Sequence, residues 1–262
     1  MLYNEDFKTL FGTSFFHFCL EKTDVYQIND ETFRISYTEK DSFILKKRIK
    51  TNKITSLRSD FLNYRWLKSK VPVPKVVFLK EIQNIEYLCL TELHGKTLDY
   101  WIGKIEPKRM VSIYAKSLKY LHSIPINKKA LFQDLTDKLK VAKLNIESGI
   151  VDCNDLQPEY KSYSLDQLYI TLYDLKPSHF DFVFTHGDYC FDNLIFQNSE
   201  LCGFIDIGRG GIADRYQDIA LAIRNIKDVY DNSLVDLFFE EYGLLYPDVK
   251  KIEFYTLLDE FY

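Results

Sequence analysis

Four polar residues stand close together in the segment THGDYCFDNLIF, residues 185–196: His186, Asp188, Asp192 and Asn193. The neighbouring segments FVFT and LIF are typical of buried strands, and a carboxylate or an amide is costly to bury unless another group pairs with it. Carboxylate and amide oxygens are also the ligands that hard divalent cations prefer. The sequence therefore raises the question of which reaction needs an Asp and an Asn five residues apart on one turn.

Phosphoryl transfer needs this set of groups: an acid that orients the attacking hydroxyl, and an Asn and an Asp that hold metal ions. The kinase signature has a His two residues before the catalytic Asp, an Asn five residues after it, and a metal-binding Asp in an Asp-Phe-Gly segment. His186, Asp188 and Asn193 follow that order, and Asp206 comes 13 residues later with Ile207 in place of Phe. The Asp–Asn spacing alone also occurs in ordinary polar turns, but the whole set indicates a phosphotransferase, with His186 holding the loop.

The first part of the chain has the pattern of a small sheet. Residues 24–49 contain β-rich segments with turn residues between them, which predicts an antiparallel meander. Residues 55–70 have apolar side chains at helical spacing, and the helix must end before Pro72 and Pro74. Two further strands are expected in KVVFLKE and IEYLCLTEL, residues 75–81 and 85–93.

The second part is mostly helical after a linker at Gly95. Two β segments with a turn at Asn198–Ser199 carry the acids, and we expect Phe182, Phe184 and Phe196 in the core. Helices are expected at residues 107–124, 133–148, 165–175, 214–230, 233–243 and 251–262. The fold class is therefore α+β and bilobal, with a small β-rich lobe at 1–94 and a larger, mostly helical lobe at 95–262.

Composition and charge indicate which kinds of ligand the protein is expected to bind and disfavour a secreted or membrane-spanning protein. The chain of 262 residues has a net charge of −4, which divides into +9 for residues 1–150 and −13 for residues 151–262. A basic half favours an anionic ligand such as a nucleotide, and an acidic half favours a cationic ligand, although the charge counts alone fit two solvated surfaces equally well. The start has no signal-peptide pattern, no apolar run is long enough to span a membrane, and the five cysteines lack metal-site spacing. We therefore expect a cytoplasmic protein with reduced thiols that binds neither nucleic acid nor membrane.

The sequence resembles the aminoglycoside phosphotransferases, and within them the 3′-phosphotransferases, or kanamycin kinases. The resemblance rests on THGDYCFDNLIF, GFIDIGRGGIADRYQDIALAIRNI, VPVPKVV and LLDEFY, and it covers the chain from about residue 24 to residue 262. It implies a kinase-like fold, a nucleotide cofactor (ATP, with GTP as the alternative), Mg²⁺, and a polycationic aminoglycoside as the substrate. A monomer or weak dimer is expected.

The resemblance also implies roles for single residues. Asp188 would be the catalytic residue that orients the acceptor hydroxyl, and Asn193 and Asp206 would be the magnesium ligands. Lys46 would contact the nucleotide phosphates, with Asp60 as its partner where the family normally has the longer Glu. The remaining nucleotide-binding positions would be Ile44 beside the adenine and the hinge residues Leu90, Thr91, Glu92 and Leu93.

The phosphate-covering loop and the substrate site depart from the family pattern. The segment LEKTDVY, residues 20–26, has no glycine, so Thr23 would help to cover the phosphates and Glu21 would repel them. Ammonium groups of the substrate require several carboxylates on separate loops. The resemblance points to Arg209, to acids of the loop VDCNDLQPEY at residues 151–160 and to the chain end: Asp152, Asp155, Glu159, Asp259, Glu260 and the terminal carboxylate of Tyr262. The family's two acids in that loop align nearer Asn154 and Gln157 of this sequence.

Two alternatives stay open at this point. A kinase of another small-molecule alcohol would use the same chemistry on a different acceptor. A non-catalytic nucleotide-binding protein is favoured by Asp60 and by the glycine-free loop, but disfavoured by the presence of Lys46, Asp188 and Asn193 together with Asp206. A protein kinase is not expected, because no APE-like element follows Asp206. Asp214 and Asp218 would cap and brace a helix.

Overall fold

The computed structural model describes residues 10, 24–36, 42–50, 56–198 and 200–262. Thr23, Glu21 and the rest of the expected phosphate loop up to residue 23 lie outside the described residues. The first part of the described chain forms a five-stranded antiparallel sheet with the strand order β1-β2-β3-β5-β4. Its strands are β1 (Asp24–Gln27), β2 (Thr32–Ser36), β3 (Ser42–Ile49), β4 (Val76–Ile82) and β5 (Ile85–Thr91).

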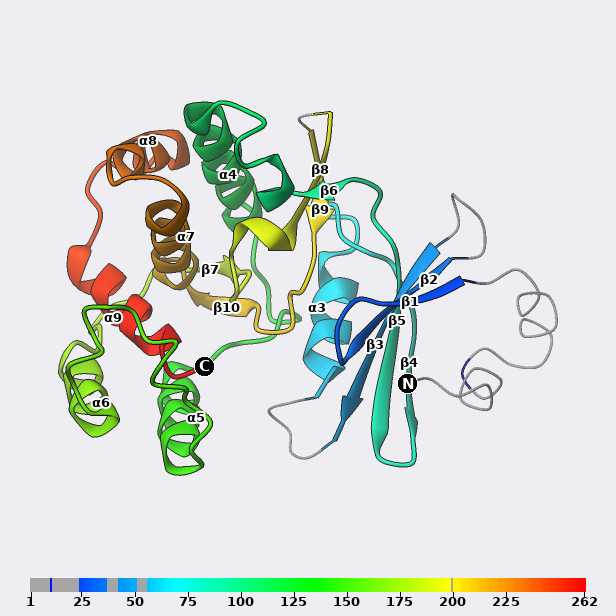
Figure 1. Cartoon of the computed structure of the whole chain (residues 1–262), viewed down its shortest axis with the longest axis horizontal. Helices are drawn as coiled ribbons and strands as arrows, with labels where there is room; N and C mark the ends of the chain where they lie inside the picture. Colours follow the sequence, from blue (N-terminus) through cyan, green and yellow to red (C-terminus); the bar gives the residue numbers. More distant parts are fainter. Residues whose placement is uncertain (1–9, 11–23, 37–41, 51–55, 199) are drawn as a thin grey trace.

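Alternation along the strands gives this sheet two different faces. Tyr87 and Cys89 of β5 pack in a small apolar cluster with residues of β2 and β3, whereas Leu88 and Leu90 belong to the large core that continues into the helical part. Helix α3 (Arg58–Leu67) contacts β4 and lies between the sheet and the helices in Figure 1. The sheet and the helical lobe are therefore joined by one apolar core.

The second part of the chain is mostly helical. Helix α4 packs on α8, and α7 packs on α9, with strongly apolar inner faces such as the run from Ile219 to Ile223 of α7. The helices are α4 (Pro107–His122), α5 (Leu135–Glu147), α6 (Leu165–Asp174), α7 (Tyr216–Val229), α8 (Ser233–Tyr242) and α9 (Val249–Asp259). Two 3₁₀ segments complete this lobe, η2 (Asp99–Trp101) and η3 (Phe191–Asn193). The expected bilobal α+β fold is confirmed.

Two small sheets carry the polar residues between the lobes. Strand β7 (Phe182–Thr185) pairs with β10 (Gly211–Asp214), and β8 (Leu194–Gln197) pairs with β6 (Lys96–Thr97) and with β9 (Glu200–Phe204). The two apolar segments that flank the polar turn at residues 186–193, β7 and β8, thus belong to different sheets. The turn connects these sheets and lies near the middle of the molecule (Figure 1).

Some sequence expectations differ from the structure in detail. Phe184 and Phe196 are buried as expected, but the prediction that Phe182 is a core residue is wrong, since its side chain is 43% exposed. Phe182 lies at the first position of β7, where its ring stacks on Phe180 at the surface. The last helix begins at Val249 and ends at Asp259, so it does not reach the final residue.

Two general expectations concern membranes and disulfides. Within the described ranges, no helix has both the length and the apolar character required to cross a bilayer. The four cysteines in those ranges, Cys89, Cys153, Cys190 and Cys202, form no disulfide. The proposed lobe boundary after residue 94 stays a prediction.

Candidate active site

The loop that carries Asp188 is anchored to two helices through its backbone. Asp218 of α7 is fully buried, and its carboxylate accepts hydrogen bonds from the backbone amides of His186 at 2.6 Å and Gly187 at 2.8 Å. Tyr114 of α4 and Tyr189 of the loop each donate a hydroxyl hydrogen bond to the backbone carbonyl of the other. These contacts fix the loop on both sides of Asp188.

Asp218 therefore has a different role from the helix brace that we expected. His122 at the end of α4 is 2.9 Å from its carboxylate, and the other ring nitrogen of His122 is 2.7 Å from the hydroxyl of Tyr242. Burial alone would raise the pKa of Asp218, but the hydrogen bond and charge of His122 lower it. Asp214 does brace a helix, because it accepts the Tyr216 amide and pairs with Lys251.

Asn193 and Asp206 are brought together by the β8–β9 hairpin. The amide of Ile205 donates to the carbonyl of Asn193 at 3.0 Å, so the residue after Ile205 lies beside Asn193. The side-chain nitrogen of Asn193 donates to the Asp188 carbonyl at 2.9 Å and lies 3.3 Å from its carboxylate. His186 connects the Asp188 loop to the end of the hairpin, since its Nε2 lies 2.8 Å from the Ile205 carbonyl oxygen. This contact fits the structural role that we expected for His186.

The donor set at this point fits Mg²⁺. Because the Asn193 nitrogen faces Asp188, its side-chain oxygen stays free of partners among the described residues, and Oδ2 of Asp206 has no partner there either. The described ranges contain no group of three or more His, Cys, Asp and Glu that could hold a metal ion. One carboxylate and one amide oxygen suit Mg²⁺, which keeps water molecules and takes further oxygens from phosphates.

Lys46 forms the ion pair that the sequence left uncertain. Its ammonium group is 3.0 Å from Asp60 of α3 and 2.7 Å from Asp206, so the shorter Asp side chain still reaches the lysine. Burial would lower the pKa of Lys46, but the charges of Asp60 and Asp206 outweigh it and raise the pKa. The same lysine offsets the effect of burial on Asp206, whose pKa is lowered. Lys46 is therefore a charged, buried group and not part of a solvated basic run.

The expected adenine-binding residues lie where the two lobes are joined. Leu90 is a buried residue within β5, and Ile44 pairs with it in the neighbouring strand β3. The amides of Thr91 and Glu92 donate to the carbonyls of Lys75 and Ser42. None of the described residues accepts a hydrogen bond from the amide of Leu93, so Leu93 is the hinge residue with a backbone donor available for a ligand.

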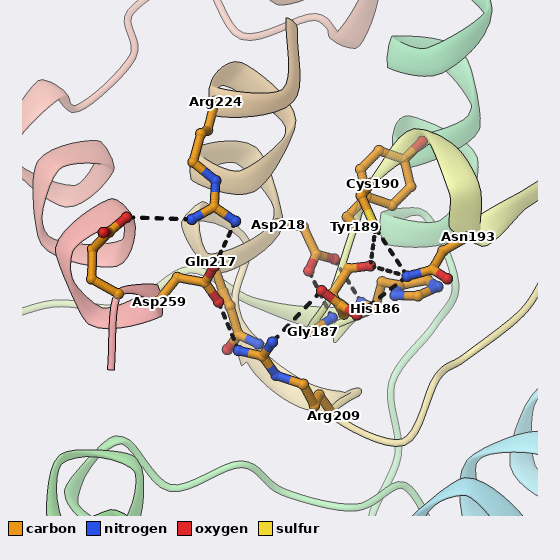
Figure 2. A network of polar contacts seen from close by, with 12 residues as sticks. His186, Gly187, Tyr189, Cys190, Asn193, Arg209, Gln217, Asp218, Arg224 and Asp259 are labelled. Atoms are coloured by element: carbon orange, nitrogen blue, oxygen red, sulfur yellow. Dashed lines mark hydrogen bonds and ion pairs between the residues drawn. The ribbon is translucent and has the colours of Figure 1, made fainter. Parts of the chain in front are cut away.

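Two arginines connect Asp188 with the acids near the chain end. Arg209 lies 3.6 Å from the carboxylate of Asp188 and 2.7 Å from that of Asp259, and its guanidinium lies over the ring of Tyr262. Arg224 pairs with Asp259 at 2.6 Å. Figure 2 shows these contacts running from Asn193 across the loop to Arg209, Asp259 and Arg224. Burial raises the pKa of Asp188, and Arg209 partly opposes this rise.

The expected substrate acids do not form one group. The carboxylate of Glu260 accepts a hydrogen bond from the Gln157 amide at 2.9 Å and lies 3.6 Å from Arg224, so Glu260 and Asp259 are both paired within the protein. Asp155 and Glu159 are exposed on the loop after α5. Asp152 accepts hydrogen bonds from Asn154, which makes it part of the turn of that loop.

A hollow of about 410 Å³ contains residues that the sequence reasoning missed. It lies between the loop with Glu159 and helices α7 and α9, and it is lined by two further acids, Asp228 and Glu253. Arg224 also lines it and connects it to Asp259. Arg224 and Asp228 are four residues apart in the sequence, which places them on the same face of a helix. This spacing could have indicated both residues as candidates.

A second hollow of about 270 Å³ lies next to the catalytic loop, and Gly187, Arg209, Asp259 and Tyr262 are part of its lining. Lys138 of α5 also faces this hollow and bonds to Gln217. Burial and the charge of Arg209 lower the pKa of Lys138 to about 7, although Asp218 and Asp259 partly offset them. The Tyr262 hydroxyl donates a hydrogen bond to the Lys138 carbonyl at 2.8 Å, which connects the chain end to α5 at the edge of this hollow.

Residues 26–255 match the model of the phosphotransferase enzyme family. An aminoglycoside 3′-phosphotransferase of Niallia circulans is 40% identical over 208 residues, which are 79% of each chain. An aminoglycoside 3′-phosphotransferase of Escherichia coli is 34% identical over 205 residues, covering 78% of this chain and 75% of the relative.

Solved structures with the same fold include two other aminoglycoside phosphotransferases. A type VIII aminoglycoside 3′-phosphotransferase has a TM-score of 0.79 at 24% identity, covering 92% of this chain and 94% of the other. A Streptomyces rimosus aminoglycoside phosphotransferase in complex with ADP and streptomycin has a TM-score of 0.76 at 20% identity, covering 94% and 97%.

Proposed function

The chain belongs to the phosphotransferase enzyme family, and we propose that it transfers the terminal phosphate of ATP to the 3′-hydroxyl of aminoglycoside antibiotics. Such a reaction inactivates the drug and confers resistance. The 40% identity to a 3′-phosphotransferase over 79% of both chains supports the acceptor position. The observation that carries the chemistry is the convergence of Lys46, Asp188, Asn193 and Asp206 between the lobes.

Each of these groups has a defined task in the proposed reaction. Lys46, held by Asp60, would bind the nucleotide phosphates, and the free amide of Leu93 would bind the adenine edge. Asn193 and Asp206 would hold Mg²⁺, which neutralises charge that develops on the phosphates. Asp188 accepts the hydrogen bond of the acceptor hydroxyl and aims it at the terminal phosphate. Early proton removal is not required, because the transition state is loose and positioning dominates.

The acceptor is proposed to bind on the side of Arg209 and the loop with Glu159. Its ammonium groups need carboxylates that are not already paired, and the exposed Asp155 and Glu159 meet this condition. Asp228 and Glu253 add two carboxylates in the neighbouring hollow, which also contains Arg224 and Lys227. Asp259, Glu260 and Tyr262 act mainly by placing Arg209 and Arg224. GTP as an alternative nucleotide, and a cytoplasmic location where ATP is available, belong to the same proposal.

A direct test uses a pair of acceptors that differ at one atom. The purified protein is incubated with MgATP and either kanamycin or its 3′-deoxy analogue, and the products are analysed by mass spectrometry and by NMR of the modified ring. We expect one phosphate on the 3′-oxygen of kanamycin and no phosphorylation of the deoxy analogue.

Three outcomes would contradict the proposed hydroxyl position, the proposed acceptor and the proposed catalysis, respectively. Phosphorylation of both acceptors would place the phosphate on another hydroxyl. Phosphorylation of choline or homoserine but not of kanamycin would indicate another small-molecule kinase. Binding of ATP without transfer to any acceptor would favour the non-catalytic alternative.

A further inference from the structure

Helix α3 has a buried face with several polar side chains, and the proposed reaction assigns a role to only one of them. Asp60, Asn63, Tyr64 and Leu67 follow helical spacing and are all buried. Such a face is usually apolar, because buried polar groups cost free energy unless they are hydrogen-bonded. Asp60 is explained by Lys46. Asn63 and Tyr64 require a separate explanation.

Both residues bind the loop that contains Asp206. The hydroxyl of Tyr64 accepts a hydrogen bond from the backbone amide of Asp206 at 3.0 Å. The side-chain nitrogen of Asn63 donates to the carbonyl of Ile207 at 2.8 Å and to that of Gly210 at 2.9 Å. Helix α3 thus forms hydrogen bonds with the backbone of this loop at residues 206, 207 and 210.

Asp206 needs external support because its backbone is strained. Its φ angle is +54°, in the left-handed region that residues other than glycine seldom adopt. Such a conformation persists only where the surroundings hold it in place. The Tyr64 hydroxyl holds the amide of Asp206, and Lys46 holds its carboxylate. The strained residue is also the one proposed to bind Mg²⁺.

Two glycines allow the Asp206 loop to pack closely against its neighbours. A Cβ atom at Gly208 would lie 2.2 Å from Oδ2 of Asp60, so only glycine allows this contact. On the other side, a Cβ at Gly187 would lie 2.1 Å from the carbonyl of Arg209. The loop is therefore packed between α3 and the catalytic turn, and a displacement of α3 must move it.

We propose that Tyr64 and Asn63 are positioning residues, which hold the Asp206 loop so that the Asp206 carboxylate faces Asn193 for metal binding. This inference rests on the proposed function, because it assigns a metal site to the same pair of residues. It makes α3 responsible for two parts of the reaction: the lysine through Asp60, and the metal ligand through Tyr64 and Asn63. Tyr64 and Asn63 are both fully buried, so they are assigned a positioning role and not a catalytic one.

The test compares Tyr64→Phe, which removes only the hydroxyl, with Tyr216→Phe as the matched control. Tyr216 is a buried tyrosine whose hydroxyl also accepts a backbone amide, that of Asp248 at 2.8 Å, away from the Asp206 loop. In steady-state assays, Tyr64→Phe should raise the half-saturating Mg²⁺ concentration roughly tenfold and leave KM for kanamycin within about twofold of wild type. Tyr216→Phe should change neither quantity.

A second measurement needs no substrate or metal. Amide hydrogen exchange of residues 205–211 in the free protein should become roughly tenfold faster in Tyr64→Phe, while exchange in β8 stays unchanged. Asn63→Leu, which keeps the volume and removes both donors, should act on the same segment and serves if Tyr64→Phe does not fold.

The proposal is overturned if both variants match wild type in Mg²⁺ dependence and in exchange of residues 205–211. Equal losses for Tyr64→Phe and Tyr216→Phe would also overturn it, because they would show a general stability effect. If the wild-type protein phosphorylates no aminoglycoside, the proposed function fails, and the exchange measurement still decides whether α3 holds the loop.

Discussion

The charged residues of the candidate site form two connected series of contacts on either side of the proposed reaction centre. On the nucleotide side, Asp60, Lys46 and Asp206 follow one another at 3.0 and 2.7 Å. On the acceptor side, Asp188 is 3.6 Å from Arg209, which is 2.7 Å from Asp259. Each charged group lies beside one of opposite sign, which limits the cost of burying it.

Lys138 provides a prediction at the scale of one residue. Its folded-state pKa is lowered to about 7, so between about pH 7 and pH 10 the unfolded chain binds more protons at this residue than the folded chain. The free energy of unfolding must then rise with pH across this window. We expect wild type to gain stability relative to Lys138→Met as the pH increases, measured by urea unfolding at several pH values.

The control for this experiment is Lys140→Met, two positions further along α5, where the lysine side chain is exposed and pairs with Asp137 at the surface. Wild type should show no comparable gain relative to this variant. A stability difference between wild type and Lys138→Met that is constant from pH 7 to pH 10 would show that folding does not lower the pKa of Lys138.

At the scale of elements, the catalytic loop depends on helices far from it in sequence. Asp218 of α7 binds two loop amides and is itself held by His122 of α4. Helix α7 also accepts the Phe191 amide through Asn225 at 3.0 Å. Helices α4 and α7 therefore set the position of Asp188, although neither contributes a residue proposed to act on the substrate or the nucleotide.

His122→Leu tests this arrangement. The substitution removes a hydrogen-bond partner of the buried Asp218, which should lower the free energy of unfolding by about 1–3 kcal/mol and lower kcat through the loosened loop. Urea unfolding and steady-state kinetics measure both effects. His179→Leu is the matched control, because His179 is exposed and 3.9 Å from its only charged partner Asp248 within the described residues. It should change stability by less than about 0.5 kcal/mol, and an equal effect of both substitutions would refute the anchoring role.

Much of the element order could be predicted from the sequence, because the periodicities are strong. The amphipathic pattern of residues 107–124 predicted α4 within two residues of its end, and Pro72 and Pro74 limited α3 as expected. The pairing of β7 with β10 could not be predicted, since short apolar segments do not reveal their partners. Phe182 was misplaced for the same reason: nothing in the local pattern shows which face of a four-residue strand is covered.

The candidate site was predictable where spacing along the chain reflects contact in space. Asp188 and Asn193 lie on one turn, so their five-residue spacing was informative. Asp218, Tyr64 and Asn63 act through the backbone of distant loops, which leaves no local pattern to recognise. The acids near the chain end were found, but their pairing with Arg224 could not be inferred without the packing of α7 on α9.

At the scale of the whole molecule, the uneven charge matches the two proposed ligands. Residues 1–150 carry a charge of +9 and residues 151–262 a charge of −13. Lys46 lies in the basic part, and Glu159, Asp228 and Glu253 lie in the acidic part. Such a division would attract an anionic nucleotide to the basic part of the chain and a polycation to the acidic part.

This division predicts a salt dependence of acceptor binding. Increasing NaCl from about 50 mM to about 500 mM shortens the Debye length severalfold, so KM for kanamycin should rise while kcat changes less. Glu159→Gln should reduce the slope of KM against salt. Glu147→Gln, which removes an exposed carboxylate at the end of α5, should leave it unchanged. A KM for kanamycin that is independent of salt would contradict the proposed acidic acceptor site.

The most direct test of the proposed reaction compares Asp188→Asn with Asp192→Asn in the transfer of phosphate from ATP to kanamycin. Both substitutions remove one negative charge from the same loop, but the Asp192 side chain is exposed, whereas Asp188 lies beside Asn193 and Arg209. We predict that Asp188→Asn lowers kcat by roughly 10²–10⁴-fold with little change in KM, and that Asp192→Asn stays close to wild type. Wild-type turnover by Asp188→Asn would contradict the assignment of Asp188 as the residue that orients the acceptor hydroxyl.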